Sequence, residues 1–248
     1  MGGGVRRATG APSGAERPVG GYARLDHDRV RRLGVPEVIL GEGKSVAHLV
    51  GIVQAHLDDR RGAFISRPTS AQRRALERLG RSGRPLRFLA HGRLVRVPGP
   101  LEGRYRSGTV GLLAAGTSDV PVAEEARALL EELGVRTVHA YDVGVAGLHR
   151  LFRALRALER ARPELFLVFA GREGALPTVV AGLVGAPVVG IPTSIGYGRG
   201  GRGEAALGAM LQSCAPIVVV NIDAAVPAAL FAAQHFARRG GARGRTGR

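Results

Sequence analysis

Cysteine and long apolar runs are both scarce in this sequence of 248 residues. Its only cysteine is Cys214, and a single thiol cannot form an internal disulfide framework but is typical of a reducing cytoplasm. No apolar run approaches the roughly 20 residues of a membrane-spanning helix. The Gly- and Arg-rich N-terminus also lacks the apolar core of a signal peptide. We therefore expect a soluble, cytoplasmic protein without membrane contact.

Lysine is nearly absent as well. All of the 36 basic residues except Lys44 are arginine, and the formal net charge is +16. From Gly108 to Phe236 there are 10 Arg against 11 Asp or Glu, so the excess lies before this segment and in the tail. This arginine bias is typical of coding composition rather than of a phosphate-binding face, and nucleic acid is not the expected partner. We interpret residues 1–21 and 239–248 as disordered basic arms.

Two blocks of strand and helix patterns lie between these arms. The first, 22–103, is predicted to be a small α/β domain that ends in the Pro- and Gly-rich stretch 98–103. Its expected elements are helices 22–33, 46–57 and 70–79, strands 38–40 and 63–66, and a hairpin over 86–97 about Gly92.

The second block, 104–238, alternates strictly between strand and helix. Expected strands are 110–115, 137–141, 165–170, 187–191 and 217–222, and expected helices are 122–133, 146–160, 177–183, 204–212 and 227–238. Continuous apolar strands indicate a sheet that is buried on both faces, and the alternation indicates parallel, right-handed crossovers. The predicted fold is α/β, a three-layer α/β/α domain with a five-stranded parallel sheet.

Three strand ends in this block share small and polar residues. The first turn contains Gly116, Thr117, Ser118 and Asp119; the second contains Gly171, Glu173, Gly174 and Ala175; the third contains Thr193, Ser194, Gly196 and Tyr197. Any such domain needs Gly and Ser at its turns. Three such turns at one sheet edge nevertheless predict a ligand site there, since ligands bind at the carboxyl ends of parallel strands.

The third turn also contains a literal G-x-G-x-x-G, at Gly196, Gly198 and Gly201. It follows a strand and precedes a helix, and Asp223 ends the next strand, so part of a dinucleotide-binding fingerprint is present. Only one strand follows it, however, where a full dinucleotide domain needs several. We therefore favour a mobile glycine-rich loop over the site.

Several long motifs resemble the nickel-pincer cofactor biosynthesis family LarB. They are AGTSDVPVAEEA, YDVGVAGLHRL, AGREGALPTVVAGLVGAPVVGIPTSIGYG and SCAPIVVVNID, and LDHDRVRRLGVPEVILGEGK resembles the N-terminal region of that family. The second block is also similar to the PurE-type aminoimidazole-ribonucleotide carboxylases, which implies their flavodoxin-like fold and octameric assembly. That family has a catalytic histidine before its Leu-Pro, where this sequence has Ala175. This difference argues against the purine reaction.

The resemblance to LarB implies a specific reaction. The pyridinium ring of nicotinic acid adenine dinucleotide is carboxylated with CO2 or bicarbonate and the phosphoanhydride is hydrolysed, giving pyridinium-3,5-biscarboxylic acid mononucleotide and AMP, the first step of nickel-pincer cofactor synthesis. A pyridinium ring is too electron-poor to attack CO2, but addition of a thiolate converts it into a nucleophilic dihydropyridine. The family places its nucleophile in the SCAP motif, at Cys214; a cysteine that only packs is the alternative.

This reaction also needs a base and groups that hold the substrate, and the residues of the three turns offer candidates. Glu173 is the candidate base that removes the ring proton, with Asp119 second, although either carboxylate can instead cap a helix. Thr117, Ser118 and Ser194 are expected to hold phosphate or ribose oxygens, and Lys44 reaches a phosphate or carboxylate unless it is simply a surface lysine. The remaining expected substrate contacts are Gly116, Gly171, Gly174, Ala175, Thr193, Gly196 and Tyr197. Mg²⁺ is the expected metal and no organic cofactor is expected, but spacing identifies no metal ligands.

Cys214 precedes the last strand, at the sheet edge opposite the three turns. Either the preceding helix end folds over, or the thiol enters the site of a neighbouring subunit. We hypothesise a site that is shared between subunits of a homo-oligomer, with an octamer expected. The sequence departs from the family pattern at Arg172, at 199–204 and at 224–227. Two other functions remain open: a carboxylase or mutase acting on another ribonucleotide, and a non-catalytic nucleotide-binding oligomer.

Overall fold

The computed structural model describes residues 16–81, 83–101 and 108–239. Its N-terminal part contains β1 (Glu16–Val19), β2 (Ala23–Asp26), α1 (Arg29–Leu33), β3 (Val38–Leu40), α2 (Val46–Asp58), β4 (Ala63–Ser66), α3 (Ser70–Arg81), β5 (Arg87–Leu89) and β6 (Leu94–Val97). The C-terminal part contains β7 (Thr109–Ala114), α4 (Val120–Glu132), β8 (Arg136–Ala140), α5 (Leu148–Glu159), β9 (Leu165–Ala170), α6 (Leu176–Ala181), β10 (Val188–Pro192), α7 (Glu204–Leu211), β11 (Ile217–Val219) and α8 (Ala225–Arg239).

A five-stranded parallel sheet forms the centre of the C-terminal part, which confirms the predicted fold class. Its strand order is β8-β7-β9-β10-β11. In this flavodoxin-like order β8 is added on one side of β7 and β9, β10 and β11 on the other, so the strand order reverses between β7 and β9. Every residue of β7, β9 and β10 is buried, whereas β8 and β11 are partly exposed edge strands. The continuous apolar pattern of the three central strands therefore reflects helices on both faces.

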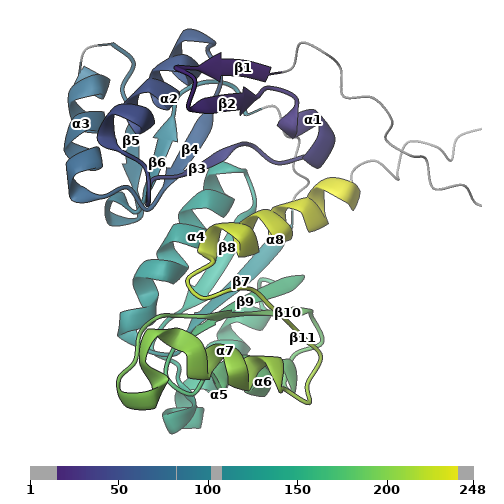
Figure 1. Ribbon diagram of the computed structural model, residues 1–248. Coiled ribbons are helices and arrows are strands. Elements are labelled where there is room, and N and C mark those ends of the chain that lie inside the picture. Colours follow the sequence, from purple (N-terminus) through teal and green to yellow (C-terminus); the bar gives the residue numbers. More distant parts are fainter. Residues whose placement is uncertain (1–15, 82, 102–107, 240–248) are drawn as a thin grey trace, which may run out of the picture.

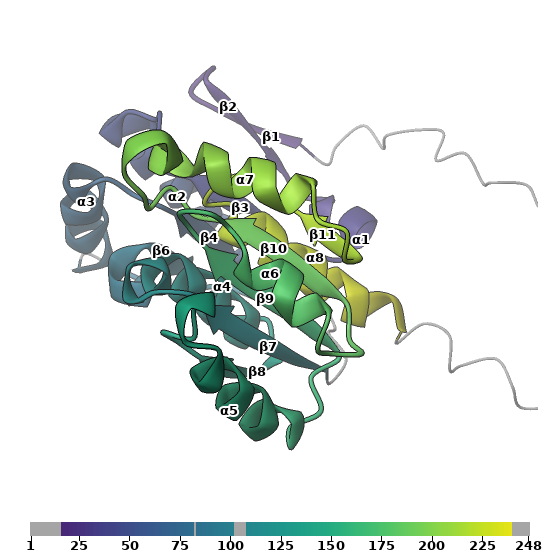
Figure 2. The ribbon, with the colours of Figure 1, turned by 90° about the horizontal axis from the view of Figure 1, so that it is seen from below.

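Helices α4 and α8 lie on one face of this sheet, and α5, α6 and α7 lie on the other (Figures 1 and 2). Each face has its own apolar core, one built mainly on α4 and α8 and the other on α5, α6 and α7. The three layers follow directly from the strand and helix alternation in the sequence.

The N-terminal part contains a second, four-stranded sheet in the order β3-β4-β6-β5. Strands β3 and β4 are parallel, and β5 and β6 form an antiparallel hairpin, as predicted over 86–97. This part has a core of its own, but Phe64, Leu94 and Val35 belong to the core that contains α4 and α8. The two sheets are therefore joined through α4 and α8, as Figure 1 shows.

The predicted helix over 22–33 is wrong. Residues 16–26 form the hairpin β1–β2, and only Arg29–Leu33 is helical. The turn contains Gly20 and Gly21, both with positive φ, a conformation that glycine adopts without steric cost. The adjacent Tyr22 ring stacks on His48 of α2 at 4.0 Å. Residues 16–21 of the predicted disordered arm are thus ordered; residues 1–15 and 240–248 lie outside the described residues.

The last strand is shorter than predicted, Ile217–Val219 instead of 217–222. Asp223 adopts φ 54° and donates its backbone N–H to the carbonyl of Pro192 at the end of β10, so the chain turns soon after it leaves β11. Within the described ranges, no helix has the length and apolar character needed to cross a bilayer.

Candidate functional site

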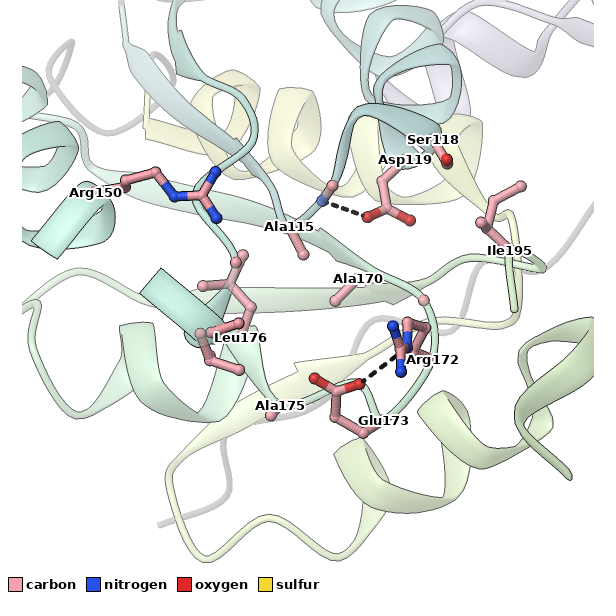
Figure 3. A pocket seen from close by; sticks show the side chains of 15 residues that line it. Ala115, Ser118, Asp119, Arg150, Ala170, Arg172, Glu173, Ala175, Leu176 and Ile195 are labelled. Atoms are coloured by element: carbon pink, nitrogen blue, oxygen red, sulfur yellow. Dashed lines mark hydrogen bonds and ion pairs between the residues drawn. The ribbon is translucent and has the colours of Figure 1, made fainter. Parts of the chain in front are cut away.

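A cavity of about 340 Å³ lies at the carboxyl ends of the central strands, at the point where the strand order reverses (Figure 3). It is lined by Ala115, Gly116, Ser118 and Asp119 after β7, by Gly144, Val145, Ala146 and Arg150 after β8, by Ala170, Gly171, Arg172, Glu173, Ala175 and Leu176 from β9 into α6, and by Ile195 after β10. This is the position at which open α/β sheets bind ligands.

Asp119 ties two of these turns together. One carboxylate oxygen accepts a hydrogen bond from the Gly116 backbone N–H at 2.8 Å, and the other accepts one from the Thr193 hydroxyl at 2.5 Å. Both side chains are buried, Asp119 being 4% exposed and Thr193 fully buried. Burial raises the pKa of Asp119 above its ordinary value, and these hydrogen bonds partly offset the rise. The carboxylate thus fixes the turn after β7 to the end of β10.

Gly171 allows the turns after β9 and β10 to approach closely. A Cβ atom at this position would lie 2.3 Å from the carbonyl oxygen of Ile195 and 2.7 Å from the Thr193 hydroxyl. Contacts that short do not occur. The glycine is therefore required by packing, and the site wall would move with any larger residue.

Glu173 and Arg172 form the exposed rim of the cavity after β9. Their side chains are 62% and 66% exposed, and the shortest distance between guanidinium and carboxylate is 3.8 Å, so the ion pair is weak. The Arg172 guanidinium also lies 5.0 Å from the ring centroid of Tyr197, in the range of a cation–π contact. Glu173 consequently keeps a carboxylate that is accessible from solvent and from the cavity (Figure 3).

The structure brings part of the predicted site together. Six predicted residues line the cavity: Gly116, Ser118, Asp119, Gly171, Glu173 and Ala175. Thr193 acts behind the wall through Asp119. The cavity lining does not include Thr117, Gly174, Ser194, Gly196, Tyr197, Lys44 or Cys214.

Cys214 lies at the other end of the sheet. It is exposed and precedes β11, whose first residue pairs with the first residue of β10. The adjacent Ser213 is held by a 2.8 Å hydrogen bond from Thr178 of α6. The thiol and the cavity of one subunit are therefore separated by the length of the sheet, as the order of the elements predicted.

The glycine-rich segment and Lys44 occupy different places. The residues from Gly198 to Gly203 form irregular 3-10 turns before α7, and Gly200 lies near the backbone of Arg172. The segment thus adjoins the rim of the cavity. Lys44 is exposed in the loop between β3 and α2, where its carbonyl oxygen accepts a hydrogen bond from Gln72.

Sequence reasoning missed the turn after β8. Gly144, Val145, Ala146 and Arg150 line the cavity, but this turn has no serine or threonine to mark it. The sequence signal for a close approach here was the glycine at position 144, where an added Cβ atom would lie 2.9 Å from the carbonyl oxygen of Ala115. Arg150 is on a helix and carried no local signal.

The cavity offers few metal ligands. Both oxygens of Asp119 already accept hydrogen bonds, which leaves Glu173 as the other carboxylate in the lining. The described residues contain no group of three or more His, Cys, Asp or Glu side chains suited to holding a metal ion.

Comparisons with known proteins agree with this architecture. Residues 109–242 match the AIR carboxylase family, and residues 18–96 match the family described as the LarB/PurE-like N-terminal domain. An uncharacterized protein of Methanocaldococcus jannaschii is 37% identical over 212 residues, which cover 84% of this chain and 82% of that protein.

Enzymes are found among the relatives of the C-terminal part. The N5-carboxyaminoimidazole ribonucleotide mutase of Pyrococcus horikoshii is 32% identical over 129 residues, 50% of this chain and 69% of that enzyme. A probable mutase of the same kind from Methanothermobacter thermautotrophicus is 33% identical over 131 residues, 50% of this chain and 37% of that protein. On the match over residues 109–242, the chain belongs to the AIR carboxylase family, and it carries a LarB/PurE-like N-terminal domain.

Proposed function

We propose that this protein carboxylates the pyridinium ring of nicotinic acid adenine dinucleotide and hydrolyses its phosphoanhydride. The products are pyridinium-3,5-biscarboxylic acid mononucleotide and AMP. The match of residues 18–96 to the LarB/PurE-like N-terminal domain supports this substrate, and the match of residues 109–242 to the AIR carboxylases supports carboxyl chemistry on a nucleotide.

The observation that carries the proposal is the residue at position 175. Ala175 lines the cavity directly before Leu176 and Pro177, where the resemblance to the purine enzymes places a catalytic imidazole. None of the described residues in the cavity lining is a histidine. No imidazole is available there for acid–base chemistry, which favours a reaction that depends on a thiol instead.

In the proposed reaction the Cys214 thiolate adds to the pyridinium ring and forms a C–S bond, and the ring becomes a neutral dihydropyridine. Its enamine-like carbon attacks CO2 and forms the new C–C bond. A base then removes the proton from that carbon, the ring regains its aromatic electrons, and the thiolate leaves. Electrons and atoms balance without an oxidant.

Glu173 is the favoured base because its carboxylate is exposed at the cavity rim. Asp119 is less suited, since both of its oxygens are already hydrogen-bonded and the side chain is buried. We assign Asp119 a positioning role. Mg²⁺ would be held mainly by substrate phosphates and water, a common arrangement, and no step is assigned to it.

Separation of Cys214 from the cavity supports a site that is shared between subunits of a homo-oligomer, for which we propose an octamer. Mixing two inactive variants tests this. Cys214→Ser and Glu173→Gln subunits, co-expressed with different tags and purified through both, should regain ring carboxylation because some sites combine an intact thiol with an intact carboxylate. Mixed oligomers that stay inactive, or a monomeric variant with full activity, would refute the shared site.

The direct test of function is incubation with the dinucleotide, bicarbonate and Mg²⁺, followed by mass spectrometry. A mononucleotide product that has gained one carboxyl group, together with released AMP, is the expected result. Similarity to the ribonucleotide mutases favours one alternative, a carboxylase or mutase acting on another ribonucleotide. Turnover only of an aminoimidazole ribonucleotide would establish it, and binding without any turnover would indicate a non-catalytic module.

A further inference from the structure

We propose that Arg150 recognises an oxyanion of the substrate in the cavity, either the ring carboxylate or the phosphate of the mononucleotide half. The reaction scheme above gives this residue no role. The choice of substrate depends on the proposed function, whereas the presence of an oxyanion subsite does not.

Arg150 lies in the first turn of α5 and contributes its side chain to the cavity. Figure 3 places its guanidinium across the cavity from Arg172 and Glu173. The wall beside it consists of backbone and small apolar side chains, including Gly144 and Ala146. A ligand that fills the cavity would therefore meet Arg150 as the cationic group on that side.

Two neighbours orient the guanidinium. One terminal nitrogen donates a 2.6 Å hydrogen bond to Asp142, a residue with φ 57° in the turn after β8. The guanidinium also packs over Gly147, where a Cβ atom would lie 2.8 Å from Nε and 3.2 Å from the second terminal nitrogen. The absence of a side chain at position 147 thus leaves the space that Arg150 occupies.

The remaining donors suit an oxyanion. A guanidinium has five N–H groups in a planar fork that matches carboxylate and phosphate geometry. The hydrogen bond to Asp142 uses one of them, and Asp142 itself is exposed, so it competes only weakly. Gly147, the N-cap of the 12-residue helix α5, provides no side-chain cap. The helix dipole adds to the attraction for an anion at the same place.

The two carboxylates that line the cavity engage groups other than Arg150. Asp119 already accepts hydrogen bonds at both oxygens, and Glu173 lies beside Arg172. The carboxylate that binds Arg150 is Asp142, which does not line the cavity, and this bond leaves the other N–H groups of the guanidinium for a ligand.

The test compares two ligands that differ in one group. Dissociation constants are measured calorimetrically for the nicotinic acid and nicotinamide adenine dinucleotides with the full-length protein and its Arg150→Gln variant. The expected loss is roughly 10- to 100-fold, as for a charge-assisted hydrogen-bonded pair. Arg153→Gln is the matched control, because it removes the same charge from an exposed position of α5 that does not line the cavity.

If Arg150→Gln weakens binding of the nicotinic acid dinucleotide alone, the bound oxyanion is the ring carboxylate. If it weakens binding of both dinucleotides equally, the bound oxyanion is the phosphate. Gly147→Ala, which keeps the charge and displaces the guanidinium, should weaken the same ligand by several-fold. Unchanged affinity relative to Arg153→Gln, or a wild-type protein that binds neither dinucleotide nor inorganic phosphate, would overturn the proposal. Binding through Arg150 without carboxylated product would refute the proposed reaction and leave this subsite standing.

Discussion

Replacing Cys214 with serine is expected to abolish carboxylation of the pyridinium ring, with a loss of roughly a thousand-fold or more in kcat. A hydroxyl at this position is a far weaker nucleophile toward the ring than a thiolate, and Cys214 is the only cysteine in the sequence. The measurement is product formation by mass spectrometry under single-turnover conditions, which removes product release from the comparison.

Stability should change little in this variant because Cys214 is exposed. Ser213→Ala is the matched control: it removes the hydrogen bonds of Ser213 with Thr178 and with the backbone of Ala215 in the same turn but keeps the sulfur. We expect Ser213→Ala to retain most of its activity. Normal turnover by Cys214→Ser, with unchanged oligomeric state, would show that the thiol has no covalent role and that the reaction follows another route.

The elements of the large sheet could be predicted because each central strand is a continuous apolar run. Strand β9 was placed without error at 165–170, and β7 and β10 within one residue at each end. These strands are buried on both faces, so their local composition reports their environment directly. The five-stranded sheet, its layers and the sheet edge at which the cavity lies therefore followed from the sequence.

The hairpin β1–β2 could not be predicted in the same way. Its order depends on contacts with α2 that are distant in sequence: Arg17 donates to the carbonyl of Ala55 and pairs with Asp59, and Tyr22 stacks on His48. A short strand with few apolar residues has little local signal, and tertiary contacts decide its conformation. The charged stretch after Tyr22 consequently resembled one long helix.

The candidate site was predictable only where the chain itself marks a turn. Gly116 and Asp119 indicate the turn after β7 in the sequence, and Gly171 and Glu173 indicate the turn after β9. Arg150 reaches the cavity from a helix, and its contribution depends on the space above Gly147. Such a placement needs the relative positions of β8 and α5, which periodicity does not provide.

The buried carboxylate of Glu125 on α4 joins the two sheets, and replacing its partner Arg93 is expected to have a large effect on stability. Glu125 is 1% exposed and accepts hydrogen bonds from Ser66 at 2.5 Å and from Arg93 at 3.1 Å. Both partners belong to the N-terminal part. Replacing Arg93 with alanine leaves the buried Glu125 carboxylate without its hydrogen-bonded cation, although the charge of Arg67 still acts on it, and we expect this to reduce the free energy of unfolding by about 3 kcal/mol.

The loss should depend on pH. Burial already raises the pKa of Glu125, and the Arg93 charge opposes that rise. Without Arg93 the folded-state pKa rises further above the unfolded value, so the folded variant binds a proton more readily than the unfolded chain does. The variant should accordingly lose stability as the pH rises from the unfolded-state pKa of Glu125 through its raised folded-state pKa. In acid its free energy of unfolding should approach that of the wild type, as measured by urea unfolding at pH 5 and pH 8.

Two controls separate the buried charge from a general charge effect. Arg87→Ala removes a 65% exposed arginine that pairs with Glu132 on the same helix, and it should cost less than about 1 kcal/mol at either pH. Adding Glu125→Gln to Arg93→Ala removes the unpaired charge and should recover part of the stability while abolishing the pH dependence. A loss in Arg93→Ala that is independent of pH would show that Arg93 stabilises the junction by packing and that the charge of Glu125 contributes little.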